Sequence, residues 1–417
     1  MLPKVFRKTP LAWLQVTRER TRLAVAIAGI TFADILMFLQ LGFKDALFNA
    51  AVKPYEAFNT DLVLVNPQFE TLFAVKSFSR ERLYQAAGVS GVKSVNSLYI
   101  SVAQWRNLAD PNQKPQPKEE SAKEIDERPN PQMERPILVF GTDPGQPAFN
   151  LPEVNRHLHE LKMLNRILFD QAGRPEYGPI ATLLQQEKVL PVQLNNLDVR
   201  VTGVFTLGAS FTADGNVITS ISTFLRLFPN RKSDEIDVGF ITLKPGADIQ
   251  QVKNTLEKVF EPNNKKQPLE VLVLTLDEFA EREKEYWGNA TPIGFIFGFG
   301  TVIGFIVGIV IVYQILYSDV SDHLPEYATL KAMGYADSYL IGVLIQEAFI
   351  LAILGFLPGC VLATGLYYLA NSATMLPIVM TLDRATLVLV LNLVMCVGSG
   401  LIAMRKLQAA DPADIFS

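Results

Sequence analysis

The chain has 417 residues, of which 49% are hydrophobic and 19% are charged. Its 38 Lys and Arg nearly balance its 42 Asp and Glu, giving a net charge of −4, so bulk charge gives no support for nucleic-acid binding. Two cysteines and three histidines exclude a disulfide scaffold and leave little for a zinc site. The composition instead indicates membrane spans combined with a sizeable aqueous domain.

The N-terminal residues 1–22 predict a basic, amphipathic helix on the inner membrane surface. Thr9 and Pro10 form a helix start signal, and the apolar Trp13 and Leu14 precede three arginines, a pattern typical of interfacial helices. Six of these residues are Lys or Arg and only one is acidic. The positive-inside rule therefore places the N-terminus in the cytoplasm.

Four segments have about the 20 apolar residues that a helix needs to cross a bilayer. These predicted spans are residues 23–43, 292–317, 339–369 and 385–404. The first is longer than the core of a signal peptide, about 7–15 residues, so we expect an uncleaved anchor.

The spans and the N-terminal charges predict the topology of the remaining segments. The large domain 44–290 and the short loop 370–384 would be periplasmic, and the loop 318–337 and the tail 405–417 would be cytoplasmic. The loop 318–337 has one Lys against four acids, so the charge rule is weak there and the first span decides the orientation.

The domain 44–290 predicts an α+β fold inserted between the first and second spans. Alternating or β-branched runs predict strands at 61–65, 136–140, 198–205, 237–243 and 269–274. Helices are expected after Ser79 and over 248–260, so the segment 237–274 predicts a βαβ-like unit. At nearly 250 residues, the domain has room for two lobes.

Three other parts of this domain have distinctive patterns. Residues 107–135 contain five prolines and few large apolar residues, which predicts a mobile insertion. Residues 44–53, ending before Pro54, and the charged segment 277–287 predict two helices that form a stalk between the membrane and the domain. His157 and His159 are close in sequence, but a solvated helix face is the favoured interpretation over a metal site.

The sequence contains none of the catalytic motifs considered. A Walker A phosphate loop, HExxH, GxSxG and CxxC are all absent, so we expect a non-catalytic protein without a metal or cofactor of its own. Cys360 and Cys396 fall in the third and fourth spans, where packing is the favoured role.

Polar and small residues within the spans are candidates for helix packing or transport. Asp34, Gln346 and Glu347 are the intramembrane polar candidates; an interhelical hydrogen bond is favoured over a proton pathway, which stays open. Glycines also recur along one arc of the second span, where they predict close helix packing or dimerisation, with a pore lining as the lesser alternative. These glycines are Gly294, Gly298, Gly300, Gly304 and Gly308.

Three sequence motifs resemble a known family of membrane proteins. Residues 326–334 read EYATLKAMG and residues 410–416 read ADPADIF; both resemble signatures of FtsX/MacB-type ABC transporter permeases. The order of a basic helix, one span, a large domain and three further spans also resembles this family. Residues 41–48 (LGFKDALF) resemble the DevC subgroup, which is known from cyanobacteria.

The resemblance implies the fold, the partners and the role of the chain. It implies a MacB-like periplasmic core and the permease subunit of an ABC exporter in the bacterial inner membrane, with both termini cytoplasmic. A separate DevA/MacB-type ATPase would bind the ATP and contact the coupling loop. The residues of that loop implied to act in coupling are Glu326, Leu330, Lys331, Ala332, Met333 and Gly334.

Further partners and alternatives also follow from the resemblance. It implies a homodimer, a membrane-fusion adaptor, a TolC-like outer-membrane channel and a glycolipid or other lipidic cargo. FtsX-like signalling to a cell-wall hydrolase and Lol-type lipoprotein extraction remain alternatives. A secondary transporter is disfavoured, because only two acids lie in the spans and no inverted repeat is visible.

Overall fold

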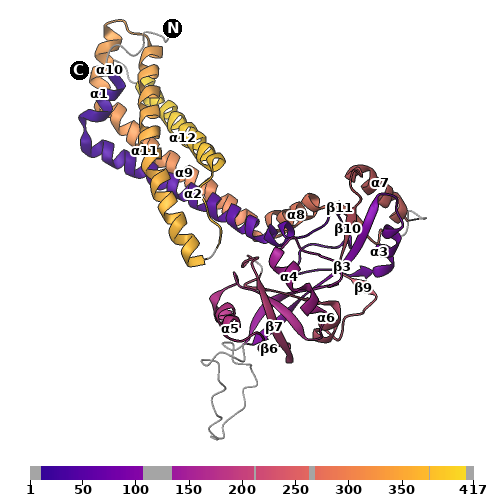
Figure 1. Cartoon of the computed structure of the whole chain (residues 1–417). Helices are drawn as coiled ribbons and strands as arrows, with labels where there is room; N and C mark the ends of the chain where they lie inside the picture. Colours follow the sequence, from indigo (N-terminus) through magenta and orange to yellow (C-terminus); the bar gives the residue numbers. More distant parts are fainter. Residues whose placement is uncertain (1–10, 107–133, 211–212, 263–267, 375, 410–417) are drawn as a thin grey trace, which may run out of the picture. The chain divides into compact units, whose positions relative to one another are not determined.

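The structure is a computed structural model that describes residues 11–106, 134–210, 213–262, 268–374 and 376–409 (Figure 1). It divides into two compact units, which we call the helix bundle (1–46 and 291–417) and the sheet domain (47–290). Most of the predicted insertion 107–135 and all of the C-terminal motif 410–416 lie outside the described residues.

Among the described residues, four helices are long and apolar enough to cross a membrane, which confirms the four predicted spans. They are α2 (Arg20–Glu56), α9 (Pro292–Asp322), α11 (Asp337–Thr374) and α12 (Leu382–Ala409). The bundle also contains the short helices α1 (Leu11–Arg18) and α10 (Leu324–Ala332). The predicted N-terminal helix is therefore interrupted at Glu19, and its start signal at Thr9 and Pro10 lies outside the described residues.

Two apolar clusters hold the helix bundle together. One joins Ala26 and Ile30 of α2 to Leu316 of α9, Ala348 of α11 and Met395 of α12. The other is formed by a separate set of side chains from α2, α11, α12 and the segment before α12: Met37, Phe38, Ala363, Tyr367, Ile378 and Val388. The opposite faces of the helices carry exposed apolar side chains, as expected for helices surrounded by lipid.

The sheet domain is built on a nine-stranded sheet with the order β11-β1-β10-β3-β4-β8-β5-β7-β6, and a two-stranded pair, β2-β9. The strands are β1 (Leu62–Val65), β2 (Phe78–Ser79), β3 (Val92–Arg106), β4 (Arg135–Thr142), β5 (Arg166–Asp170), β6 (Leu190–Leu194), β7 (Leu197–Phe205), β8 (Asn216–Ser220), β9 (Glu235–Ile236), β10 (Val238–Leu243) and β11 (Leu272–Thr275). The helices are α3 (Arg80–Ala87), α4 (Pro152–Leu161), the 3₁₀ helix η3 (Pro175–Tyr177), α5 (Ile180–Gln186), α6 (Ile221–Leu227), α7 (Ile249–Phe260), α8 (Leu276–Glu285) and the π-helix η4 (Tyr286–Ala290).

Strand β3 belongs to two parts of the sheet at once. Its first half pairs with β10, where Leu98 lies opposite Val238. Its second half pairs with β4 along one edge, and its end pairs with β6 along the other, where Trp105 lies opposite Leu194. The strands β3-β4-β8-β5-β7-β6 therefore close into a ring, while β11-β1-β10 continue from β3 as an open sheet. The two lobes expected from the length share one strand.

The sheet is covered on both faces. Side chains of successive strand residues point to opposite sides of a sheet, and here both sets are buried. In β1, Leu62 and Leu64 belong to one buried cluster, and Val63 and Val65 belong to the other. This is why the predicted strands read as continuous apolar runs rather than as a polar–apolar alternation.

The five predicted strands are confirmed as β1, β4, β7, β10 and β11. The helix starts are also confirmed, because Ser79 caps α3 and Asp248 caps α7 through side-chain acceptors. The βαβ-like unit is β10-α7-β11, with β1 lying antiparallel between its two strands. These elements make the sheet domain an α+β fold.

The prediction that the helix from the first span stops before Pro54 is wrong. Helix α2 includes Pro54 and ends at Glu56. Proline costs a helix one hydrogen bond, but this loss falls in the last turn. Tyr55 in that turn is fully buried against Phe58 and Phe279, and this packing keeps the turn helical.

Candidate functional site

The predicted coupling segment forms a short helix with a defined end. Helix α10 contains positions 326–332, and Gly334 follows with φ +92°, a left-handed conformation. The N–H of Tyr335 donates to the carbonyl of Leu330 at 3.1 Å, which is the hydrogen bond of a glycine-terminated helix end. Gly334 is therefore needed for its backbone conformation, because a side chain there would be strained.

The side chains of this segment differ in their exposure to solvent and in their contacts. Glu326 and Met333 are exposed, Leu330 is half-buried, and Tyr335 contacts Tyr339 with ring centroids 5.1 Å apart. The side chains of Lys331 and Ala332 lie outside the described residues. The segment thus presents an acid on α10 and exposed apolar side chains directly after the helix.

Arg22 is the centre of an ion-pair cluster beside α10. Its guanidinium lies 3.2 Å from Glu19 and 3.6 Å from Asp319, and it also donates to Asp322. The cluster joins the start of α2 to the end of α9. The neighbouring Arg18 lies 3.6 Å from Glu326 of α10, but both of these side chains are largely exposed.

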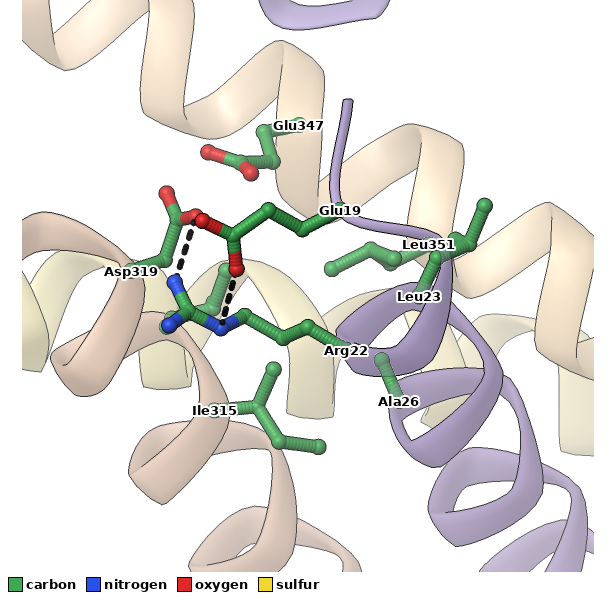
Figure 2. Close-up of a pocket in the computed structure, with 9 residues that line it drawn as sticks. Glu19, Arg22, Leu23, Ala26, Ile315, Asp319, Glu347 and Leu351 are labelled. Carbon is green, nitrogen blue, oxygen red and sulfur yellow. Dashed lines mark ion pairs between the residues drawn. The ribbon is translucent and has the colours of Figure 1, made fainter. Parts of the chain in front are cut away.

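The ion-pair cluster borders a small cavity (Figure 2). The cavity offers about 20 Å³ to the centre of a water molecule, which is room for about one water. Figure 2 shows the charged ends of Glu347 of α11, Asp319 of α9 and Arg22 turned toward the same region, with a dashed line that marks the ion pair of Arg22 and Asp319. Its lining residues are Glu19, Arg22, Leu23, Ala26, Ile315, Leu316, Asp319, Glu347 and Leu351.

Replacing Arg22 with Gln should destabilise the helix bundle by about 1–3 kcal/mol, because the buried Asp319 loses its cationic partner. Arg18→Gln is the matched control, and its exposed ion pair should contribute within about 0.5 kcal/mol. Unfolding of the full chain by SDS in mixed micelles measures both. Equal effects of the two substitutions would contradict the importance of Arg22.

The three intramembrane polar candidates do not form one group. Asp34 is fully buried and accepts a hydrogen bond from Asn392 at 2.7 Å, which joins α2 to α12. Glu347 is buried at the cavity, whereas its neighbour Gln346 is exposed, because adjacent helix residues differ in direction by about 100°. The Asp34 contact has the form of an interhelical hydrogen bond; its role stays a prediction.

The five glycines of α9 also have different surroundings. A Cβ atom added to Gly308 would lie 2.9 Å from that of Ala33 in α2 and would overlap Met395 in α12. Gly300 and Gly304 likewise face α2, at Gln40 and Met37. Gly298, in contrast, has open space, and Gly294 is half-buried.

Sequence reasoning missed several of these site residues. Asp319 lies in the predicted loop 318–337, but α9 continues to Asp322. The acid excess between the second and third spans is partly balanced by Arg22, which is distant in sequence. Asn392 was a detectable signal, because a polar residue in an apolar span usually has a partner.

The C-terminal part of the chain matches a known protein family. Residues 294–412 match the FtsX-like permease C-terminal family. This FtsX-like region includes most of α9 and all of α10, α11 and α12, and therefore contains the predicted coupling segment and Asp319 and Glu347. No curated protein matches the sequence.

Two solved structures resemble part of the chain. The periplasmic region of MacB from Actinobacillus actinomycetemcomitans is 10% identical, with a TM-score of 0.33, over 54% of this chain and 93% of that one. The extracellular domain of the noncanonic ABC-type transporter YknZ from Gram-positive bacteria is 14% identical, with a TM-score of 0.33, over 52% of this chain and 100% of that one.

Among the described residues, no group of three or more His, Cys, Asp or Glu side chains could hold a metal ion. His157 contacts Glu160, one turn further along α4, with Nδ1 3.1 Å from Oε1. The candidate site at the α10 end of the helix bundle therefore consists of the Arg22 ion pairs, the small cavity and α10 itself.

Proposed function

We propose that this chain is the non-catalytic, membrane-spanning subunit of an ABC-type exporter, and that a separate ATPase contacts α10. The observation that supports this most strongly is α10 itself, which lies in the FtsX-like region and is followed by the left-handed Gly334. The helix and the turn after it offer a partner both a charge, at Glu326 of α10, and an exposed apolar side chain, at Met333.

The ion pairs beside α10 support a route by which movement of the ATPase reaches the membrane helices. Arg18 contacts Glu326 of α10, and Arg22 contacts Asp319 and Asp322 of α9. Helix α2 continues from Arg20 to Glu56 without interruption. A displacement of α10 would therefore act on the end of α1, next to the start of α2, and on the end of α9.

The remaining parts of the assembly are proposals that rest on the resemblance and on the charge pattern. We place both termini in the cytoplasm and residues 44–290 in the periplasm of the inner membrane. A second copy of the chain, a membrane-fusion adaptor and a TolC-like channel complete the proposed exporter. The DevC-like segment 41–48 supports a glycolipid or other lipidic cargo.

Co-purification of the full chain with its partners from native membranes tests this assignment. A cell-wall hydrolase in place of the adaptor would favour signalling, and a lipoprotein carrier would favour lipoprotein extraction.

Gly334→Ala should lower ATP turnover that depends on the permease, because the substitution strains the end of α10 by about 1–3 kcal/mol. Lys331→Ala should also lower it, while insertion of either variant into the membrane is unchanged. The control is Gly246→Ala in the sheet domain, where the glycine also has positive φ and open space around it. The assay is ATP hydrolysis by the co-purified ATPase in nanodiscs. Normal coupling in both α10 variants would exclude the proposed contact.

A further inference from the structure

We propose that a polar pocket in the sheet domain binds a neutral saccharide. The pocket lies where the end of β3 meets the turn between β6 and β7. Its described lining residues are all polar: Gln104, Arg106, Glu134, Gln193, Asn195 and Asn196. The inference goes beyond the proposed function, because it concerns a ligand of the sheet domain and depends neither on an ATPase partner nor on the proposed cargo.

The pairing of β3 with β6 places the polar side chains outside the apolar core. Trp105 of β3 lies opposite Leu194 of β6, and both side chains are buried in one apolar cluster. Because successive strand residues point to opposite faces, Gln104, Arg106 and Gln193 lie on the other face. Gln104 is exposed there, and the other two are half-buried. This edge of the ring therefore combines a packed core with a polar outer surface.

The turn between β6 and β7 supplies the two asparagines. It consists of Asn195 and Asn196, whose φ values are +47° and +63°, and a two-residue turn with positive φ at both positions favours asparagine. Asn195 Oδ1 accepts from the N–H of Gln104 at 2.9 Å, and its amide donates to the carbonyl of Leu227 at 3.3 Å. Asn195 thus holds the turn against β3, while Asn196 is exposed beside the pocket.

The two charges of the pocket compensate each other. The guanidinium of Arg106 donates to Glu134 and also to Oε1 of Gln193, the latter at 3.4 Å. A guanidinium that is already paired with a carboxylate offers an anion such as phosphate little net attraction. The paired carboxylate is equally unsuited to a cation. The pocket therefore favours a ligand without charge.

Hydrogen-bonding groups in the pocket remain available to such a ligand. Among the described residues, Nε of Arg106 is buried without a hydrogen-bond partner, and a buried donor in this state is costly. The exposed amides of Gln104 and Asn196 each provide two donors and an acceptor. The hydroxyl groups of a saccharide both donate and accept at closely spaced positions. They can therefore accept from Nε of Arg106 and pair with both amides.

The size and lining of the pocket favour a saccharide over a peptide. The pocket offers about 190 Å³ to the centres of water molecules, more than ten times the about 10–15 Å³ that one water needs. A small solute, rather than a single water, therefore fits. The described lining contains no apolar side chain that could receive the side chains of a peptide, whereas a saccharide needs mainly hydrogen bonds.

Saturation-transfer difference NMR on the full chain in nanodiscs tests the proposal. The probes are glucose, galactose, N-acetylglucosamine and maltose, and empty nanodiscs give the background. We expect saturable transfer to at least one probe. In Gln104→Ala and in Asn196→Gly, the affinity for that probe should fall about tenfold, because hydrogen bonds to the ligand are lost. Transfer to none of the four probes would overturn the proposal.

The two substitutions are chosen so that the sheet domain still folds. Gln104 is exposed on β3, and glycine adopts the positive φ of Asn196 without strain. Gln250→Ala is the matched control, because it removes an exposed amide from α7, and this variant should bind like the wild type. Thermal midpoints check that each variant is folded. Equal affinity in the wild type and in a folded pocket variant of each kind would overturn the site.

Two further probes separate a neutral saccharide from other ligands. Sodium sulfate should displace the bound saccharide no more than sodium chloride of equal ionic strength, since Glu134 already balances Arg106. Triglycine should show no saturable transfer. Displacement by sulfate, or saturable transfer to triglycine that the pocket variants lose, would overturn the assignment. These measurements need no ATPase, so their failure is distinct from a failure of the coupling assay.

Discussion

Replacing Gly308 with alanine destabilises the helix bundle, whereas Gly298→Ala leaves it nearly unchanged. Both glycines lie on α9, but only Gly308 packs against Ala33 and Met395 of neighbouring helices. An added methyl group must displace these side chains, and overpacking of this kind costs about 1–3 kcal/mol. Unfolding by SDS in mixed micelles, followed by helical circular dichroism, measures the difference.

The comparison between these two glycines separates packing from helix propensity. Alanine favours a helix over glycine by about 1 kcal/mol, and this gain is common to both variants. We therefore expect Gly298→Ala to be neutral or slightly stabilising. If Gly308→Ala were equally well tolerated, the close approach of α9 to α2 and α12 would be wrong.

Replacing Glu283 with alanine has the largest expected effect in the sheet domain. Glu283 is only 1% exposed, and its carboxyl accepts hydrogen bonds from the Tyr55 hydroxyl at 2.6 Å, the Leu72 N–H at 3.1 Å and the Trp287 indole N–H at 2.8 Å. Its loss removes a shared acceptor from three segments. We expect a loss of about 2–4 kcal/mol, since each buried donor without its acceptor costs about 1–3 kcal/mol.

Hydrogen exchange of the full chain measures this effect locally. Protection should fall at the end of α2, after β1 and in α8, which are the segments that carry the three donors and Glu283. Glu285→Ala is the matched control, because Glu285 is exposed on the same helix. Similar protection in both variants would show that the Glu283 hydrogen bonds do not hold these segments.

The same residue gives the sheet domain a pH dependence. Burial raises the pKa of Glu283 above its ordinary value, although the hydrogen bonds from Tyr55, Trp287 and Leu72 oppose this. The folded domain thus binds more protons than the unfolded chain just above the ordinary pKa of Glu, about 4.3. Its stability should fall as the pH rises through that window, and Glu283→Gln should remove this contribution.

Glu278 contributes to the pH profile with the opposite sign. Burial acts to raise the pKa of Glu278, but hydrogen bonds from Lys253 and Thr275 outweigh it and the pKa is lowered. The stability from Glu278 is therefore present above the ordinary Glu pKa and lost as the pH falls below it. The difference between wild type and Glu283→Gln cancels this contribution, so pH titration of both proteins isolates Glu283. A constant difference between them would contradict the shift.

The apolar elements of the fold could be predicted because their signal is local. The four spans and the strand LVLV of β1 are continuous apolar runs, and helix caps such as Asp248 are read from single residues. Strand β3 was missed, because its sequence VKSVNSLYISVAQWR mixes polar residues into a strand whose two halves have different partners. Which strands pair across such distances is decided by tertiary packing.

The candidate site was predicted only in part, for a related reason. Glu326 and Gly334 form a contiguous motif and could be identified from sequence. Arg22 and Asp319 are almost 300 positions apart, so their contact depends on how α2 packs against α9. Glu347 can be identified as unusual because it interrupts an apolar span, whereas Asp319 falls in the predicted loop 318–337, because the predicted second span ends before α9 does.

The shared strand β3 restricts how the sheet domain can be divided or can twist. Because its two halves complete the closed ring and the open sheet along one continuous backbone, neither portion retains all its edge partners if the other is excised. A twist applied to the open sheet must also twist the ring, because β3 runs through both parts as one continuous strand. The domain should consequently respond to force as one torsional element rather than as two hinged lobes.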